Sequence, residues 1–295
     1  MPLESVPEMA RLARSKGYAI GYFESWNLES LYGVIEAAER ARAPVIVGFN
    51  GEFLSHEGRV AEERLSWYGA LGKACAADAK VPCGFIFNEC AQDDWTRRAV
   101  TAGFNLVMPA DPEASYDDYR ARVGALAEYA HAHGVAIEAE LGELPSGVAH
   151  SPGHEAERTD PARARDFVAA TGVDFLAVSI GNVHVALSGR TALDLDHLKA
   201  IRAAVDVPLV LHGGTGIADD SLRRAVTMGV AKVNYGTGLK QRYLAAVRRA
   251  LSSAEPNPHL LLGMGGPDDV MVAGRQAVRE AVLERIPALG CAGRA

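Results

Sequence analysis

The sequence has few cysteines, no long apolar run and no excess of basic residues, and each shortage excludes a class of protein. Its four cysteines (Cys75, Cys83, Cys90 and Cys291) are too few and too irregularly spaced for a disulfide framework or a zinc ribbon. No apolar stretch reaches the ~18 residues of a membrane-spanning helix, and the N-terminus lacks the apolar core of a signal peptide. The formal net charge of −7 offers no basic surface to nucleic acid or acidic membranes. We therefore expect a cytoplasmic protein with no nucleic-acid or membrane partner.

A dinucleotide-binding fingerprint and inter-domain linkers are also missing. No GxGxxG follows the first expected strand, which disfavours an open, doubly wound sheet. No linker-like or low-complexity stretch divides the 295 residues, so we expect one domain over 1–295. The polar segment at about 142–160 is longer than an ordinary loop and is expected to form a mobile lid, with a disordered surface insertion as the alternative. A helical extension is expected at about 255–295.

Eight short apolar runs alternate with longer amphipathic segments. Most runs are apolar almost throughout, as are strands buried on both faces of a parallel sheet. Eight such β–α units in a chain of this length predict an α/β fold, the closed (β/α)8 TIM barrel. The expected strands cover residues 19–23, 44–50, 82–88, 105–110, 136–142, 175–181, 208–214 and 231–237.

Polar side chains stand where these strands end, and in a barrel of this kind the chemistry lies at that rim. His184 and His212 each close a strand unit, and imidazole is a common ligand of Zn²⁺, so we expect them to share a metal site. Five further histidines lie on expected helices or in the lid and are expected to be solvated. They are His131, His133, His150, His154 and His197.

Two glycine-rich turns follow the seventh and eighth expected strands. HGGTG (212–216) and NYGTG (234–238) both precede a helix, so their backbone N–H groups suit a phosphate. One such turn alone is weak evidence, because barrels also use glycine there for steric reasons. Two together, at the position where these barrels commonly hold phosphate, strengthen the prediction.

These segments resemble the class II, metal-dependent fructose-bisphosphate (ketose-bisphosphate) aldolase family along nearly the whole chain. The motifs on which the resemblance rests include NLESLYGVIEAAERARAPVIVGF, YAHAHGVAIEAELG and TDPARARDFVAATGVDFLAVSIGNVH. The most specific are VPLVLHGGTGI and GVAKVNYGT. The resemblance implies a divalent metal that polarises a ketone, most simply Zn²⁺, with Mn²⁺, Fe²⁺ or Co²⁺ as alternatives. It also implies site residues. His184 and His212 match two metal ligands, Glu140 an additional cation position, and Asn50, Gly213, Thr215, Asn234 and Thr237 are expected to contact substrate or its phosphate.

The third strand departs from the family pattern. The family has Asp-His-Gly there, whereas this chain has Asn88, Glu89 and Cys90. Asparagine has no titratable proton near neutrality, so Asn88 is expected only to hydrogen-bond a substrate hydroxyl. Glu89 is expected to replace the third histidine as a metal ligand, with a general base that needs no metal as the alternative. Val185 and Gly236 also differ from the family, so cleavage of fructose 1,6-bisphosphate in glycolysis is disfavoured.

The leading hypothesis is a metal-dependent carbon–carbon lyase that acts on a phosphorylated or polyhydroxylated ketose through an enediolate. A lid glutamate, Glu143 with Glu155 or Glu157 as alternatives, is expected to move protons. Three other functions stay open: a sugar-phosphate isomerase or epimerase, a Schiff-base aldolase using Lys232, and a non-catalytic sugar-phosphate-binding barrel. The resemblance also implies a homo-dimer or homo-tetramer, with the C-terminal helix as a contact.

Overall fold

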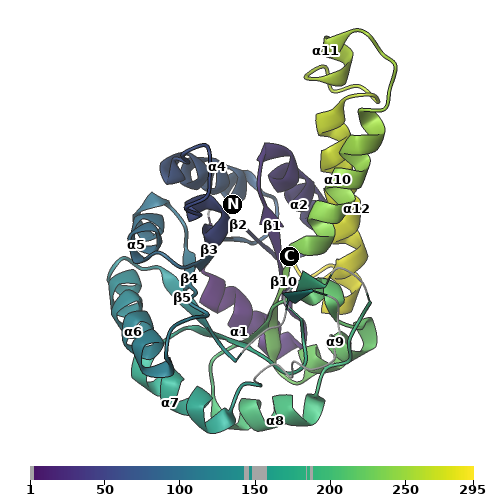
Figure 1. Ribbon diagram of the computed structural model, residues 1–295. Coiled ribbons are helices and arrows are strands. Elements are labelled where there is room, and N and C mark those ends of the chain that lie inside the picture. The colour runs from purple at the N-terminus through teal and green to yellow at the C-terminus, as the bar shows by residue number, and fades with distance from the viewer. Residues whose placement is uncertain (1–2, 143–145, 148–157, 184, 187–188) are drawn as a thin grey trace.

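Eight parallel strands close into a barrel, with helices packed around its outside (Figure 1). This computed structural model describes residues 3–142, 146–147, 158–183, 185–186 and 189–295. Around the barrel the strand order is β1-β10-β9-β7-β5-β4-β3-β2, so the first and last barrel strands of the chain pair and leave no edge. The barrel strands are β1 (Ile20–Ser25), β2 (Val45–Asn50), β3 (Cys83–Cys90), β4 (Leu106–Pro109), β5 (Ala136–Leu141), β7 (Phe175–Val178), β9 (Leu209–Leu211) and β10 (Val230–Tyr235).

All eight expected strands are present, and the TIM-barrel prediction is confirmed. Two of them, β7 and β9, end three residues earlier than expected. The reason is Asn182, whose side chain accepts from the backbone N–H of Ile180 and donates to the carbonyl oxygen of His212. This buried side chain takes the place of strand pairing at the rim and frees the backbone after each strand to turn. A separate pair of two-residue strands, β6 (Ser146–Gly147) and β8 (Val185–Ala186), lies beside the rim.

The helices follow from amphipathic patterns and from end signals in the sequence. Five glycines that lie just before strands (17, 103, 134, 172 and 229) have φ between 68° and 109°, a backbone conformation that residues with a Cβ disfavour. The main helices are α1 (Val6–Lys16), α2 (Leu28–Ala41), α4 (Leu65–Asp78), α5 (Asp93–Ala102), α6 (Tyr116–Ala132), α7 (Pro161–Thr171), α8 (Leu195–Ala204), α9 (Asp219–Thr227), α10 (Thr237–Ala250) and α12 (Val270–Leu289), with short α3 (Gly51–Ser55) and α11 (Pro258–Leu261).

The core lies between the outer face of the strands and the helices. In β3 every residue is buried, and Phe85 stacks on Phe104 with ring centroids 4.1 Å apart. Full burial of such a ring contributes roughly 1.5–3 kcal/mol. The strands are thereby held rigidly, which fixes the side chains at their carboxyl ends.

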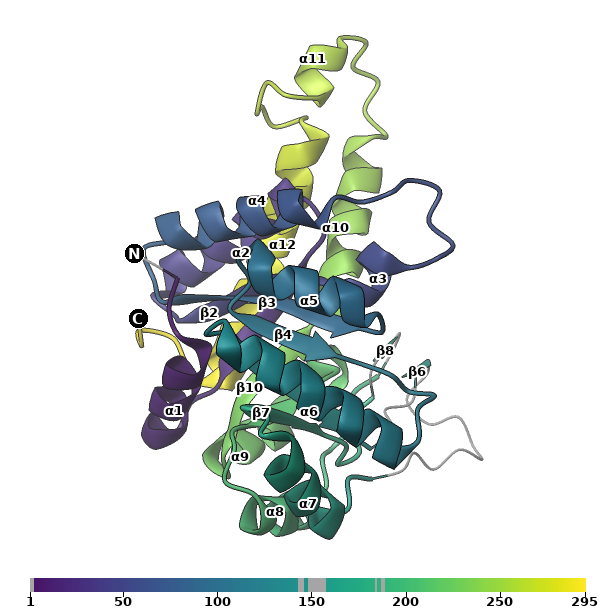
Figure 2. The same ribbon diagram turned by 90° about the vertical axis from the view of Figure 1, so that its left-hand side faces the viewer.

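The two ends of the barrel are different. Helix α1 covers the amino-terminal end, where the backbone N–H of Glu4 donates to the carbonyl oxygen of Cys83 (Figure 2). At the other side, α10 and α12 pack together and project from the barrel as a hairpin with α11 at its tip. Because α1 covers the amino-terminal end, the site lies at the open carboxyl end of the barrel.

In the described part of the chain, no helix has the length and apolar character to cross a membrane.

Candidate active site

A pocket of about 450 Å³ opens at the carboxyl end of the barrel. Its lining comes from β1, β2, β3 and β10, from the turn after β9, and from α3 and α10. The lining includes eight residues predicted as site residues: Asn50, Asn88, Glu89, His212, Gly213, Thr215, Asn234 and Thr237.

The end of β3 breaks the alternation of a regular strand. The pairing of β3 with β4 shifts register between Phe87 and Cys90, and Glu89 has a left-handed φ of 55°. This conformation is less stable for a non-glycine residue by about 1–2 kcal/mol. Consecutive strand residues normally point to opposite faces. The irregularity lets both Asn88 and Glu89 line the pocket.

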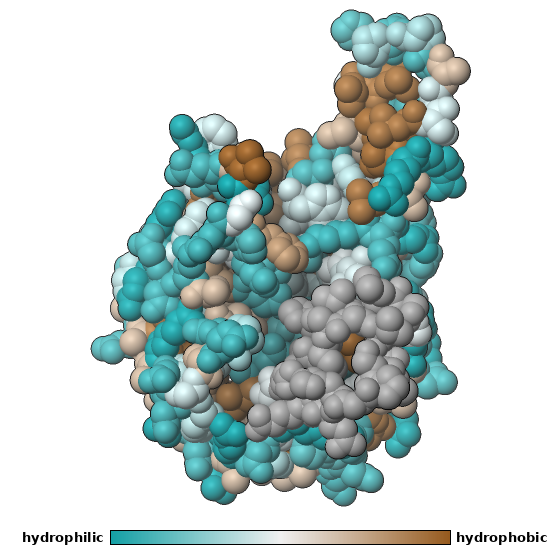
Figure 3. All heavy atoms as spheres, viewed as in Figure 1, coloured by the Kyte–Doolittle hydropathy of each residue, from teal (hydrophilic) through white to brown (hydrophobic). Residues whose placement is uncertain are grey.

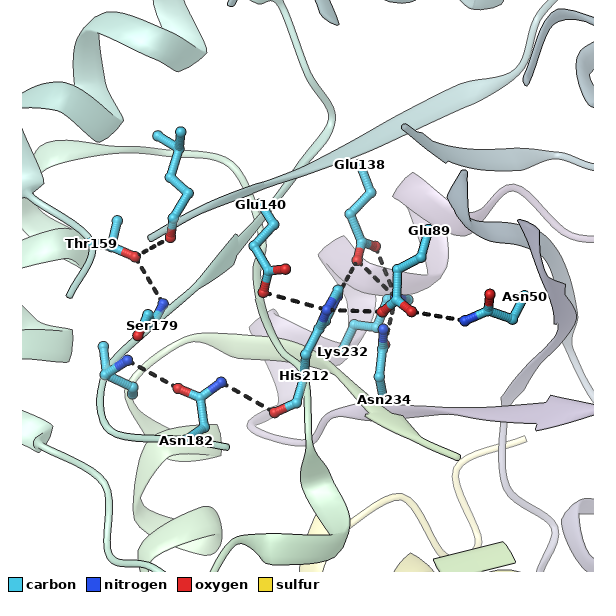
Figure 4. Close-up of polar contacts among 12 residues, drawn as sticks. Asn50, Glu89, Glu138, Glu140, Thr159, Ser179, Asn182, His212, Lys232 and Asn234 are labelled. Carbon is cyan, nitrogen blue, oxygen red and sulfur yellow. Dashed lines mark hydrogen bonds and ion pairs between the residues drawn. The ribbon is translucent and has the colours of Figure 1, made fainter. Parts of the chain in front are cut away.

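His212 lies at the centre of a cluster of carboxylates (Figure 4). Its Nδ1 is 3.2 Å from Glu89 Oε1 and 3.4 Å from Glu140 Oε1, and its Nε2 is 3.0 Å from Glu138 Oε1. Burial lowers the pKa of His212, but the three carboxylates outweigh it and raise that pKa to about 10. Because a carboxylate only accepts, Nε2 carries the hydrogen that it shares with Glu138. Nδ1 then faces the two rim glutamates.

A second, fully buried ion pair lies beneath this cluster. Lys232 Nζ is 2.8 Å from Glu138 Oε2 and 3.0 Å from Glu138 Oε1, and both side chains have no exposed surface. Burial raises the pKa of Glu138, but Lys232 and His212 outweigh it and hold that pKa below its ordinary value. Burial also lowers the pKa of Lys232, and this effect outweighs the negative charge of Glu138, which raises that pKa. Glu138 thus joins His212 to the lysine.

Lys232 also fixes the orientation of Asn234. Its Nζ donates to Asn234 Oδ1 over 2.6 Å. An ammonium group has no acceptor, so the amide oxygen must face the lysine and the amide nitrogen must face away. Asn234 Nδ2 is buried and has no hydrogen-bond partner within the described residues. It is therefore a donor available to a molecule in the pocket.

Asn50 and Asn88 face each other in the register of β2 and β3. Asn50 Nδ2 donates to Glu89 Oε2 over 2.8 Å, and its Oδ1 accepts from the backbone N–H of Phe53 at the start of α3. Asn50 is thereby held in one orientation and steadies Glu89. Asn88 is 2% exposed, and its Oδ1 has no hydrogen-bond partner in the described part of the chain.

The two glycine-rich turns meet on the other wall of the pocket. Gly213, with φ of 67°, leads into a one-turn helix at Gly214–Gly216, and Gly236 precedes α10. Thr215 Oγ1 accepts from the backbone N–H of Gly238 over 3.3 Å and so links the turns. The first N–H groups of α10 have no intrahelical partner, which favours an anion at this position.

The donor set fits a divalent cation in part. His212 offers an imidazole nitrogen next to two carboxylates, and its other nitrogen is bound by Glu138, an arrangement typical of metal-ligating histidines. Within the described residues, however, no three histidine, cysteine or acidic side chains form a ready ligand cluster. His184, the second predicted histidine, lies outside the described residues.

Other predicted residues have different outcomes. Most of the expected lid lies outside the described residues, including His150, His154 and the three lid glutamates, Glu143, Glu155 and Glu157. His131 and His133 are exposed as expected, but the prediction for His197 was wrong. It is half-buried and its Nε2 contacts the carbonyl oxygen of Thr159, because α8 packs it against that loop. Cys90 is buried as a small core residue.

The sequence analysis did not identify Glu138 or Lys240, and it named Lys232 only as a possible Schiff-base lysine. The two acids of AIEAELG signal two inward-facing carboxylates at a spacing of two, Glu138 and Glu140. Lys240 was not considered, and its Nζ is 2.5 Å from Glu24 Oε1 at the pocket wall.

Comparison with known proteins gives a consistent result. Residues 4–294 match the family described as Fructose-bisphosphate aldolase class-II. The sequence is 31% identical to the "Probable fructose-bisphosphate aldolase" of Bacillus subtilis (strain 168), over all of both chains. It is 34% identical to the "Uncharacterized protein YdjI" of Escherichia coli (strain K12), over 96% of each. The fold matches the crystal structure of the YdjI aldolase from Escherichia coli K12 with a TM-score of 0.83, at 31% identity and with all of both chains covered.

Proposed function

Since this chain belongs to the class II fructose-bisphosphate aldolase family and is an aldolase-type lyase, we propose that it reversibly cleaves a phosphorylated or polyhydroxylated ketose. The observation that carries this proposal is the convergence of Glu89 and Glu140 on His212, a residue that lines one pocket together with two N–H-rich turns. A ketose phosphate has a carbonyl and a phosphate, one for each of these two groups.

We assign the metal to Glu89, His184 and His212, with Glu140 as an additional ligand. Two histidines and a glutamate form a known catalytic zinc set with an open position, so Zn²⁺ is the first choice, and Mn²⁺, Fe²⁺ or Co²⁺ would also suit the carboxylate. When bound, such an ion polarises the ketone oxygen of the substrate. Glu138 orients His212 for this task by accepting its Nε2 hydrogen.

The remaining chemistry falls to side chains of the pocket. In the cleavage direction one proton leaves the C4 hydroxyl, the C3–C4 bond breaks to give an aldehyde and an enediolate, and one proton returns to C3. Asn234 Nδ2 donates to an oxygen of the ketose half, and Asn88 hydrogen-bonds a substrate hydroxyl. Neither amide transfers a proton near neutral pH. Proton transfer therefore falls to the lid glutamate Glu143, or to Glu155 or Glu157, and glycolytic cleavage of fructose 1,6-bisphosphate is not the proposed reaction.

The phosphate is proposed to bind Gly213, Thr215, Asn234 and Thr237. The link between Thr215 and Gly238 supports this, because it brings the two turns together. Asn50 would act on the substrate through Glu89, which it holds.

Metal reconstitution tests the proposal. Metal-stripped protein is supplied with Zn²⁺, Mn²⁺ or Co²⁺, and bound metal, deuterium exchange at the ketose C3 and aldehyde release are measured. We expect about one ion per chain and activity that returns with it. Glu89→Gln and His212→Asn should each weaken metal binding by at least tenfold, while the exposed controls Glu57→Gln and His259→Asn should not. Deuterium exchange without aldehyde release would favour an isomerase or epimerase. The absence of both deuterium exchange and aldehyde release would refute the proposal.

We also propose a homo-dimer or homo-tetramer in the cytoplasm. The projecting hairpin exposes the apolar side chains of Leu260, Leu262 and Met264. Figure 3 shows an apolar area near the end of this hairpin. Such an area on a projecting arm suits contact with a second copy of the chain. The four cysteines are free, which suits a reducing compartment.

A further inference from the structure

The wall of the pocket at the end of β1 carries an ion pair that the proposed reaction does not use. Glu24 is 8% exposed, and its Oε1 is 2.5 Å from Lys240 Nζ. The same Nζ lies 4.0 Å from the ring centroid of Phe53. All three residues line the pocket. A carboxylate and the face of an aromatic ring together hold this cation in place.

Gly236 makes room for the carboxylate. A Cβ at this position would lie 2.3 Å from Glu24 Oε2, a distance that no real contact allows. The φ of Gly236 is −133°, which other residues also adopt, so close approach and not backbone handedness explains the glycine. Glu24 thus occupies the space that a side chain at 236 would fill. The chain places a carboxylate from β1 directly beside the phosphate-binding turn.

The charges of the pocket are unfavourable for a second phosphate. Glu24, Glu52 and Glu89 bring three carboxylates to the lining, whereas Lys240 is the one lysine or arginine among the lining residues that the structure describes. The segments outside the described residues contain no lysine or arginine in their sequence. A phosphate carries about −1.5 to −2 charges at neutral pH. The backbone turns serve one such group, and Lys240, the one lysine or arginine of the described lining, is already bound by Glu24.

From this arrangement we infer that the substrate is a ketose with a single phosphate and an uncharged, hydroxylated remainder, and that Glu24 is a specificity-determining residue. This inference rests on the proposed function. Its carboxylate accepts hydrogen bonds from substrate hydroxyls and repels a second phosphate. Lys240 holds the carboxylate in place at the pocket wall.

Binding and turnover together test the inference. Fructose 1-phosphate and fructose 1,6-bisphosphate are titrated calorimetrically into the metal-loaded protein, and kcat/KM is measured for both. We expect the monophosphate to bind and react at least tenfold better. Glu24→Gln should reduce this preference by about tenfold or more, since it removes the repelling charge and releases Lys240. The exposed control Glu57→Gln should keep the preference, and circular dichroism checks that each variant is folded.

A second variant, Gly236→Ala, tests the same residue without changing a charge. Its methyl group must displace the carboxylate of Glu24, so binding of fructose 1-phosphate should weaken while the preference over the bisphosphate falls. Equal or better binding of the bisphosphate by the wild type, or an unchanged ratio in Glu24→Gln, would overturn the inference. Preference in binding without any turnover would instead leave the inference standing and count against the proposed function.

Discussion

The buried pair of Lys232 and Glu138 gives the sharpest prediction about stability. Lys232→Met removes the cation and leaves Glu138 in a site with no exposed surface. Removing one partner of a buried ion pair costs about 3–5 kcal/mol, because the remaining charge is neither solvated nor paired. His212 still contacts Glu138 Oε1, so we expect the lower end of that range.

The assay is urea unfolding at one fixed protein concentration, so that the concentration term of any oligomer dissociation is the same for all variants. A double-mutant cycle adds Glu138→Gln, which keeps an acceptor for His212 but removes the charge. The double variant should be at least about 2 kcal/mol more stable than the sum of the single losses predicts, since contacting charges couple strongly. Lys199→Met, at an exposed position of α8, is the matched control and should change stability by less than about 0.5 kcal/mol.

Two results would refute this reasoning. A loss below about 1 kcal/mol in Lys232→Met would mean that the lysine is not a buried, paired cation. Strictly additive losses in the cycle would mean that the two side chains do not interact.

Three further predictions concern the barrel, the lysine and the hairpin. Gly48→Ala should lower the free energy of unfolding by about 1–3 kcal/mol in urea titrations, because its Cβ would lie 2.1 Å from the carbonyl oxygen of Ile86, and unchanged stability would contradict the strand packing. Borohydride reduction in the presence of a ketose phosphate should leave the intact mass unchanged, because Lys232 Nζ is bound by Glu138 and Asn234; an adduct on Lys232 would favour a Schiff-base aldolase. Leu262→Asp should reduce the molar mass measured by light scattering at low concentration, whereas the exposed loop control Val60→Asp should not; equal masses would exclude the hairpin tip as the contact.

Much of the barrel can be predicted because its signals are local. Each strand is a short apolar run, and five of the helices before barrel strands end at or beside a glycine whose φ is positive. These features depend only on neighbouring residues. The ends of β7 and β9 are different, because Asn182 sets them through a contact with His212, 30 residues away. That 1–295 forms a single domain stays a prediction.

The site was predicted in part. Placing polar residues at strand ends found Asn50, Asn88, Glu89, His212 and Asn234, since parallel strands bring their carboxyl ends to one rim. It did not foresee that the left-handed backbone of Glu89 brings two consecutive residues into the same pocket.

The sequence by itself determined the barrel, the family and the set of rim residues. Apolar periodicity and the order of the strands along the chain can be recognised from neighbouring residues alone. Only the tertiary structure determined which charged side chains form ion pairs. Glu138 and Lys232 are 94 residues apart, and Glu24 and Lys240 are 216 apart. Barrel closure, in which β1 pairs with β10, brings such distant groups together. Burial then makes their charges interact strongly, and no local pattern encodes that pairing.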